Sequence, residues 1–340
     1  MKHMISDTKL LCSENAMDIL LSIIFYSACS STLLIINKLA VQAIGSTSVV
    51  LIAQFAASVL AVLVANVVSP KAVHLERFTI QKLIAFTGVV LLFCFCLYSN
   101  VKALEQNSVE TVIVFRALSP IGVSFLDFKF LGRELPNRRT ALALLAIAAG
   151  ACLYAYSERT GQVSFAGPAT LWLMTYFVAI TSEMAFVKYI IESLPTSTWT
   201  RMFYNNLLSI PVITITGVFS GDFKNTSVMN LGDSYTLSIL LAAGLVGVAI
   251  SYAGFHLRSL ISATSFTVVG VLCKLATLLI SRLVWRGSFT SLGYCGLAVC
   301  ILAGCFYEQA PKRTAKKTYD LEIHAQTGKL LIGSKTLKQH

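Results

Sequence analysis

Long apolar runs separated by short polar stretches fill most of this chain, and they constrain its fold more than any other feature. Each run is roughly 18–22 residues long, which is enough for a helix to cross a bilayer. A transmembrane barrel would instead show segments of about ten alternating residues. Charged residues make up only 13% of the chain, roughly half of what soluble domains carry. We therefore predict an all-α integral membrane protein with ten spans, at 18–41, 48–68, 82–99, 109–130, 139–156, 168–191, 200–219, 236–256, 262–283 and 289–307.

The ten spans divide into two sets of five that resemble each other. Sliding residues 108–156 onto 262–310 places the fourth and fifth spans on the ninth and tenth. Because five is odd, the two sets must be inverted relative to each other, as is typical of secondary transporters. Channels and integral enzymes can also be duplicated, so the repeat narrows the class without deciding it. The predicted parts are a cytosolic lead (1–17), a first five-helix repeat (18–156), a second (157–307) and a basic cytosolic tail (308–340).

Lysine and arginine are distributed unevenly between the two sides of the predicted membrane protein. Most of the 27 fall on the side that holds both chain ends, and the other side holds only Lys102, Arg159, Lys224 and Arg286. Cytosolic loops carry such an excess, so both termini should be cytosolic. The glycosylation sequon at Asn225 falls on the opposite, lumenal side. The net charge of +11 is not arranged as a basic patch interleaved with aromatics, so we expect no nucleic-acid partner.

Lys274 stands well inside the apolar stretch Ser262–Ile280. A charge near the middle of a span costs roughly 2.5–3.5 kcal/mol, and such residues face a bundle interior or a wet cavity. An intramembrane ion pair or a snorkelling side chain is the structural alternative. Because Leu275–Ile280 continues the apolar run past the lysine, we favour contact with an anionic ligand.

Other polar residues interrupt the predicted spans. Asn205 and Asn206 are adjacent amides within the seventh span, where unmet polar groups cost several kcal/mol each. They either bond a neighbouring helix or read the edge of a base, because an amide donates and accepts at once. Ser251 taken alone favours ordinary packing. Arg116 needs an anion, which is either Glu183 or a ligand phosphate.

The sequence offers little for an enzyme. The spans hold a single histidine, His256, and no paired carboxylates, metalloprotease motif, nucleophile constellation or Walker motif. The cysteines are scattered through apolar runs, which predicts neither a metal site nor a disulfide framework. We predict a protein without cofactor, metal or catalytic activity.

Two motifs resemble those of nucleotide-sugar transporters in the drug/metabolite transporter superfamily, specifically the GDP-sugar branch. The FYNN motif of GDP-mannose transporters stands intact at 203–206, and their GALNK motif appears as GVLCK at 270–274, with Cys273 replacing asparagine. The stretches CSSTLLIINKLAV, VETVIVFRALSP and ISATSFTVVG look more like plant-type Golgi GDP-fucose transporters. The resemblance covers nearly all of residues 18–308.

The resemblance implies a role for each matching residue. Asn205 and Asn206 would contact guanine with Ser251 nearby, Gly270 would admit the ribose, and Lys274 would hold the diphosphate. Tyr204 of the same motif and Arg116 complete the predicted substrate-binding set. Phe266 stands where GDP-mannose transporters usually have tyrosine, so that hydroxyl contact is missing.

The implied function is a multi-pass Golgi antiporter that imports a GDP-sugar in exchange for GMP, with GDP-fucose favoured over GDP-mannose. Membrane lipid would surround it, and its small-residue helix faces permit a homodimer. The alternatives are a UDP-sugar or phosphorylated-metabolite carrier of the same superfamily, or a non-transporting membrane scaffold in which Lys274 serves packing alone.

Overall fold

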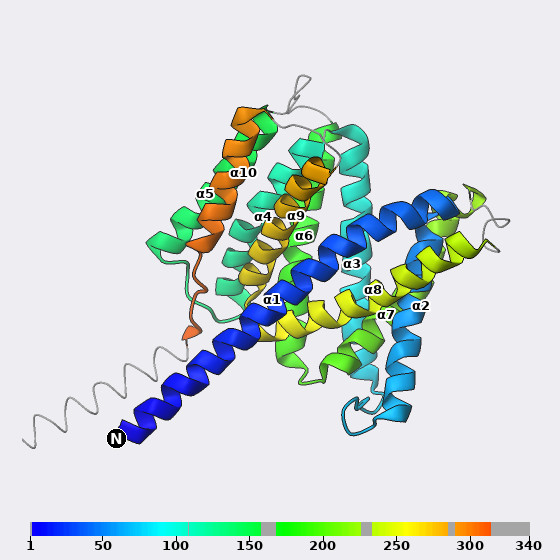
Figure 1. Ribbon diagram of the computed structural model, residues 1–340, viewed down its shortest axis with the longest axis horizontal. Coiled ribbons are helices and arrows are strands. Elements are labelled where there is room, and N and C mark those ends of the chain that lie inside the picture. Colours follow the sequence, from blue (N-terminus) through cyan, green and yellow to red (C-terminus); the bar gives the residue numbers. More distant parts are fainter. Residues whose placement is uncertain (1, 108, 158–167, 226–232, 285–289, 314–340) are drawn as a thin grey trace, which may run out of the picture.

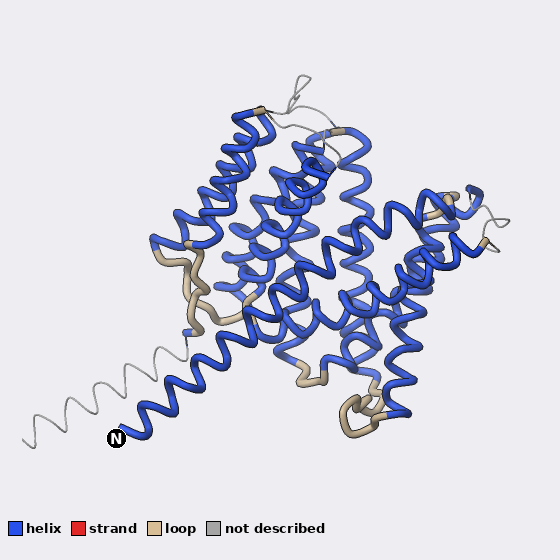
Figure 2. Tube along the Cα trace, in the orientation of Figure 1, coloured by secondary structure: helices blue, strands red, loops and turns tan. Residues whose placement is uncertain are grey.

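The computed structural model describes residues 2–107, 109–157, 168–225, 233–284 and 290–313. In these residues, helices are joined by loops and turns, and no strand is present (Figure 2). Eight helices are long and apolar enough to cross a membrane, and the apolar segments Ala263–Leu279 and Ser291–Cys305 are shorter. The elements are α1 (Lys2–Ile44), α2 (Thr47–Val68), α3 (Ile80–Gln106), α4 (Val109–Phe130), α5 (Arg138–Ser157), α6 (Pro168–Ser193), α7 (Thr198–Ser220), η1 (Asp222–Asn225), α8 (Ser234–Leu260), α9 (Ala263–Val284) and α10 (Ser291–Cys305).

The predicted spans agree with these helices to within a few residues at most ends, because apolar length decides both. Three ends differ more. Residues 2–16, expected as a polar lead, continue the first helix, α3 runs on to Gln106, and α8 runs on to Leu260. Arg258, which we expected in the loop after the eighth span, therefore lies inside α8. Asn225 ends η1, while the rest of its sequon and the tail beyond Arg313 lie outside the described residues.

Helices far apart in the sequence make the main contacts (Figure 1). α5 packs along α10, α3 along α6, α1 along α8, and α2 along α7 and α8, while α4 contacts α5, α6 and α9. Gly150 of α5 and Gly296 of α10 explain why these two helices pack so closely. A Cβ on either glycine would come within 2.7 Å of the other's carbonyl oxygen, so only glycine permits this approach.

Two carboxylates in the segments that connect helices accept hydrogen bonds from the N-terminal ends of other helices, one on each side of the molecule. We call the side where α1 begins and α10 ends the terminal side. There, Glu76 accepts hydrogen bonds from the Ser197 N–H at the start of α7 and from Lys82, both at 2.7 Å. On the opposite side, Asp222 accepts the Ser48 N–H of α2 at 2.7 Å. Burial acts to raise the pKa of both carboxyls, but these hydrogen bonds hold the pKa of Glu76 and of Asp222 below their ordinary values.

Candidate functional site

A cavity of about 260 Å³ lies among α1, α2, α3, α7, α8 and α9, and we call it the polar cavity. Aromatic rings, amides, hydroxyls and one guanidinium line it together with apolar side chains. This mixture is typical of small-molecule sites, where a few polar groups orient a ligand within an apolar wall. The lining residues used below are Tyr26, Asn37, Gln54, Asn205, Asn206, Ser251, Arg258 and Phe266.

The two asparagines of α7 have different environments in this cavity. Asn206 is buried, and its side-chain amide donates to the Met202 carbonyl and to the Ser251 hydroxyl, both at 2.8 Å. The Asn205 side chain is half-buried and makes no hydrogen bond with the described residues. Asn205 therefore has both its donor and its acceptor available to a ligand, whereas Asn206 fixes the position of Ser251.

A second amide pair, which the sequence reasoning did not include, lines the same cavity. Gln54 of α2 is almost fully buried and donates from Nε2 to the side-chain oxygen Oδ1 of Asn37 in α1 at 2.5 Å. Gly247 of α8 leaves room for it, because a Cβ there would meet the Gln54 side chain at 3.0 Å. A polar residue inside an apolar run was the available signal for Gln54, as it was for the asparagines of α7.

One face of α9 points toward this region. Phe266, Gly270 and Lys274 follow each other at intervals of four residues, which places them on one side of a helix. Phe266 lines the polar cavity, and a Cβ added to Gly270 would meet no atom within 4 Å. Gly270 therefore borders open space, and Lys274 follows one turn further along the same face. Among the described residues, no ion pair or hydrogen bond involves the Lys274 side chain.

Charged side chains gather where α4, α6, α8 and α9 meet. Arg258 approaches Glu183 of α6 at 3.4 Å, and its guanidinium lies over the Phe266 ring at 4.4 Å. Arg116 of α4 donates to the Tyr176 hydroxyl at 3.2 Å and interacts electrostatically with Glu183 and with Lys274. Among the described residues, this part of the interior therefore holds three cations and one carboxylate.

Tyr26 of α1 connects these charges to the polar cavity. Its ring packs against Phe266 with centroids 5.1 Å apart, and it lines the cavity. It also interacts electrostatically with Arg116, Glu183 and Arg258. Arg258 and Arg116 therefore lie beside the cavity that the amides line.

Tyr204, which the sequence also predicted for the site, lies outside the polar cavity. It is buried, and its ring stacks on Phe86 of α3 with centroids 5.6 Å apart. Phe78 stacks on it at 6.0 Å. This hydrophobic cluster supports α7 beneath the asparagines, while the Tyr204 ring itself faces α3.

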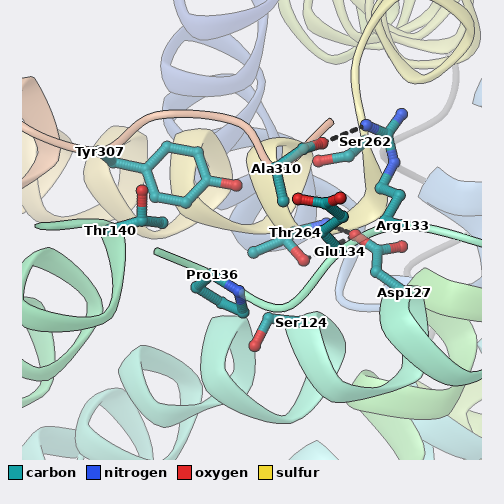
Figure 3. Close-up of a pocket in the computed structure, with 10 residues that line it drawn as sticks. All are labelled: Ser124, Asp127, Arg133, Glu134, Pro136, Thr140, Ser262, Thr264, Tyr307 and Ala310. Atoms are coloured by element: carbon teal, nitrogen blue, oxygen red, sulfur yellow. Dashed lines mark hydrogen bonds between the residues drawn. The ribbon is translucent and has the colours of Figure 1, made fainter. Parts of the chain in front are cut away.

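A separate polar cluster lies on the terminal side, at the ends of α4, α9 and α10 (Figure 3). We call it the terminal cluster. Asp127 accepts the Thr264 N–H at 2.9 Å and the Thr264 hydroxyl at 2.6 Å. Arg133 donates to the Ala310 carbonyl at 2.8 Å, and Gln309 accepts the Ser262 N–H at 3.0 Å. Only about 10 Å³ of space remains between these residues, so their side chains fill the space between the helix ends and leave no room for a nucleotide.

A wide groove of about 1080 Å³ runs between α1 and the pair α9 and α10. Its walls are mainly apolar, with Ile23, Val268 and Leu272 among them. Such walls suit a lipid-facing surface better than a phosphorylated solute. Within the described residues, no group of three or more His, Cys, Asp or Glu side chains is placed to hold a metal ion.

The fold and the polar cavity together define a class, that of multi-pass helical membrane proteins with a cationic, amide-lined site among their helices. Comparisons with known proteins narrow it. A GDP-fucose transporter of Arabidopsis thaliana is 32% identical over 85% of this chain and 85% of its own length. A GDP-mannose transporter of the same plant is 29% identical over 88% and 81%, and one of Meyerozyma guilliermondii is 22% identical over 87% and 86%. The chain belongs to the family of plant-type GDP-sugar transporters.

Two further comparisons bear on the fold. No protein-family model matches the chain. A crystal structure of another protein aligns with 86% of this chain and 96% of its own, with a TM-score of 0.64 at 13% identity. That likeness concerns the fold alone.

Proposed function

We propose that this protein is an antiporter that imports a GDP-sugar in exchange for GMP. The observation that carries the proposal is the excess of positive charge beside an amide-lined cavity. Arg258 and Arg116 interact with the carboxylate of Glu183, and Lys274 interacts with Arg116, so among the described residues three positive charges share one negative charge and two remain in excess. A charge buried without compensation is costly, and a dianionic ligand would balance this excess.

Both exchanged nucleotides fit that charge. The phosphate monoester of GMP carries about −1.5 to −2 at pH 7. In a GDP-sugar each of the two bridged phosphates keeps one negative charge, which gives about −2 as well. The cavity accepts either ligand with the same charge balance, and this supports a one-for-one exchange.

The base would be read by the amides of α7. Asn205 offers an unengaged donor and acceptor, and Ser251 stands beside it through its bonds with Asn206. A guanine edge presents a carbonyl acceptor next to ring and exocyclic donors, so one amide can bond it twice. Gly270, with open space before it, lets a ribose approach α9 on the way to Lys274.

Alternating access would operate through two inverted five-helix repeats. In such a repeat, α1 to α5 correspond in order to α6 to α10. A contact between α1 and α8 should then be matched by one between α6 and α3, and a contact between α2 and α8 by one between α7 and α3. All four contacts are present. Glu76 and Asp222 occupy equivalent positions in the two halves. Each carboxylate accepts a hydrogen bond from the start of the second helix of the other half.

The sugar, the orientation and the membrane belong to the same proposal. GDP-fucose is favoured because the GDP-fucose transporter is the more similar of the two Arabidopsis relatives described above. The excess of basic residues on the terminal side supports cytosolic termini, and the resemblance supports the Golgi membrane. A homodimer in the bilayer belongs to the same proposal, because small residues in the helix sequences permit close packing.

Ligand-induced thermal stabilisation of the purified protein tests the nucleotide assignment. We expect GMP to raise the unfolding temperature, and UMP, CMP and AMP to have little effect, because only a ligand that binds the folded state shifts the transition. GDP-fucose and GDP-mannose are then compared at equal concentration. Stabilisation by UMP would favour a UDP-sugar carrier, and a lack of response to every nucleotide would favour a membrane scaffold.

A further inference from the structure

We propose that Glu183 sets the charge selectivity of this site, so that the carrier accepts dianionic nucleotides and rejects free GDP and GTP. The inference rests on the proposed function and extends it to a residue outside the recognised motifs. Glu183 reduces three cations to an excess of two, and this excess matches GMP and GDP-sugars. Free GDP and GTP add about one and two further negative charges to that of GMP.

The geometry places Glu183 where it can do this. Its side chain is only 4% exposed, on the part of α6 that faces α8. The 3.4 Å separation from Arg258 is longer than the 2.7–2.9 Å of a tight charged hydrogen bond. The Arg258 Nε is buried and has no hydrogen-bond partner among the described residues. The guanidinium is therefore neutralised in charge but keeps a donor free, and it lies over Phe266 at the wall of the polar cavity.

The neighbouring charges do not change this balance. Lys188, one turn further along α6, pairs with Glu192 at 3.5 Å and donates to the Arg258 carbonyl. Asp127 is bonded to Thr264 in the terminal cluster. Arg116 has only the neutral Tyr176 hydroxyl as a hydrogen-bond partner among the described side chains. Among the described residues, Glu183 is therefore the carboxylate that interacts with Arg258 and Arg116 beside the cavity.

Selectivity follows from the low dielectric of a membrane interior, where any net charge left after binding is penalised. A dianion leaves the wild-type site neutral, whereas free GDP leaves one negative charge and GTP two. Replacing Glu183 with glutamine raises the excess to three positive charges. Free GDP, with about three negative charges, then gives the neutral complex. The relative affinity of the variant for GDP over GMP should therefore rise.

The test measures dissociation constants of GMP, GDP and GTP for the purified full-length protein, with EDTA present so that magnesium does not mask phosphate charge. We expect wild-type protein to bind GMP more tightly than GDP and GTP. In Glu183→Gln the GDP-to-GMP affinity ratio should rise about tenfold, while Glu183→Asp should keep the wild-type order. Ser251→Ala is the matched neutral control, because it should weaken all three ligands and leave their ratio unchanged.

Arg258→Gln gives an independent reading if Glu183→Gln yields too little folded protein. It lowers the excess to one positive charge, so the GDP-to-GMP ratio should fall below that of wild type. An unchanged ratio in a folded variant that still binds GMP would overturn the role of Glu183 and leave the GDP-sugar proposal standing. Wild-type protein that binds none of the three guanine nucleotides would overturn both.

Discussion

The terminal cluster and the polar cavity are both built from buried polar side chains, but they balance charge differently. In the terminal cluster Asp127 is bonded twice to Thr264, and Arg133 lies beside it and bonds the Ala310 carbonyl (Figure 3). In the interior near the polar cavity, the Lys274 side chain has no hydrogen bond or ion pair with a described residue, and the only described hydrogen-bond partner of the Arg116 side chain is the neutral Tyr176 hydroxyl. The two regions are alike in being buried and polar, and they differ in the balance of positive and negative charges.

This difference separates a structural role from a ligand site. Charges that neutralise one another inside the protein hold helices together, and removing one leaves its partner exposed to a low dielectric. Charges in excess destabilise the empty protein and are compensated only by a ligand, a cost that proteins accept at functional sites. Substitutions in the two regions should therefore affect different measurements.

The largest expected effect is that of Lys274→Ala on ligand binding. We expect the affinity for GMP to fall by at least 100-fold, about 2.7 kcal/mol, because the main phosphate contact is lost. The unfolding temperature of the unliganded protein should stay the same or rise, since an unpaired buried cation is removed. Lys102→Ala, which removes an exposed pair with Glu105 and a contact with the Tyr98 ring, is the control and should leave binding intact. Retained GMP stabilisation in Lys274→Ala would mean that the lysine serves packing.

Asp127→Ala should have the opposite effect. Thr264 loses its acceptor and Arg133 its neighbouring charge, so we expect a loss of about 2–3 kcal/mol in the free energy of unfolding. The dissociation constant of GMP for the remaining folded protein should change less than threefold. Thermal unfolding and a GMP titration of the same preparation measure both quantities. A normal unfolding temperature with lost GMP binding would place Asp127 in the ligand site and remove the distinction between the two regions.

The two asparagines allow a finer separation inside the polar cavity. Asn205→Ala should weaken GMP about tenfold, near 1.4 kcal/mol, with no change in unliganded stability, because its amide bonds nothing in the described protein. Asn206→Ala should also lower the free energy of unfolding by about 1 kcal/mol, since it breaks bonds to Met202 and Ser251. UMP binding serves as the comparison ligand. Equal losses for GMP and UMP would show that neither amide reads the base.

The smallest effect concerns the carboxylates that bond helix starts. Glu76→Ala or Asp222→Ala should each cost about 1 kcal/mol of stability at pH 7. Both folded pKa values are lowered from ordinary values of 4.5 and 3.8, so this stabilisation is complete above those values. It is lost as the pH falls through the lower folded values. Unfolding temperatures between pH 7 and pH 3 should fall less steeply in the double variant than in wild type, and parallel curves would contradict the assignment.

The sequence predicted most of the fold because hydropathy is a local property. Apolar run lengths located the spans, and the polar interruptions at Lys274, Arg116 and the α7 asparagines pointed to the interior. Ser251 taken alone favoured ordinary packing, and only the resemblance placed it near the base; its bond with Asn206 joins residues 45 positions apart. No local pattern records such a contact.

Arg258 shows where sequence reasoning failed and why. Its position two residues past the predicted end of the eighth span assigned it to a cytosolic loop, as the rule for basic residues suggests. The helix continues to Leu260, and the guanidinium turns toward Glu183 of α6, 75 residues away in sequence. The direction of a long side chain depends on tertiary packing, so neither composition nor spacing could supply it.

Nucleotide exchange in proteoliposomes tests the central claim most directly. Purified protein is reconstituted into vesicles loaded with GMP, with UMP or with buffer, and uptake of labelled GDP-fucose is followed. The account predicts rapid uptake only into vesicles that contain GMP, and none by Lys274→Ala. Equal uptake into buffer-loaded vesicles, or exchange that UMP supports as well as GMP, would contradict a guanine-specific antiporter.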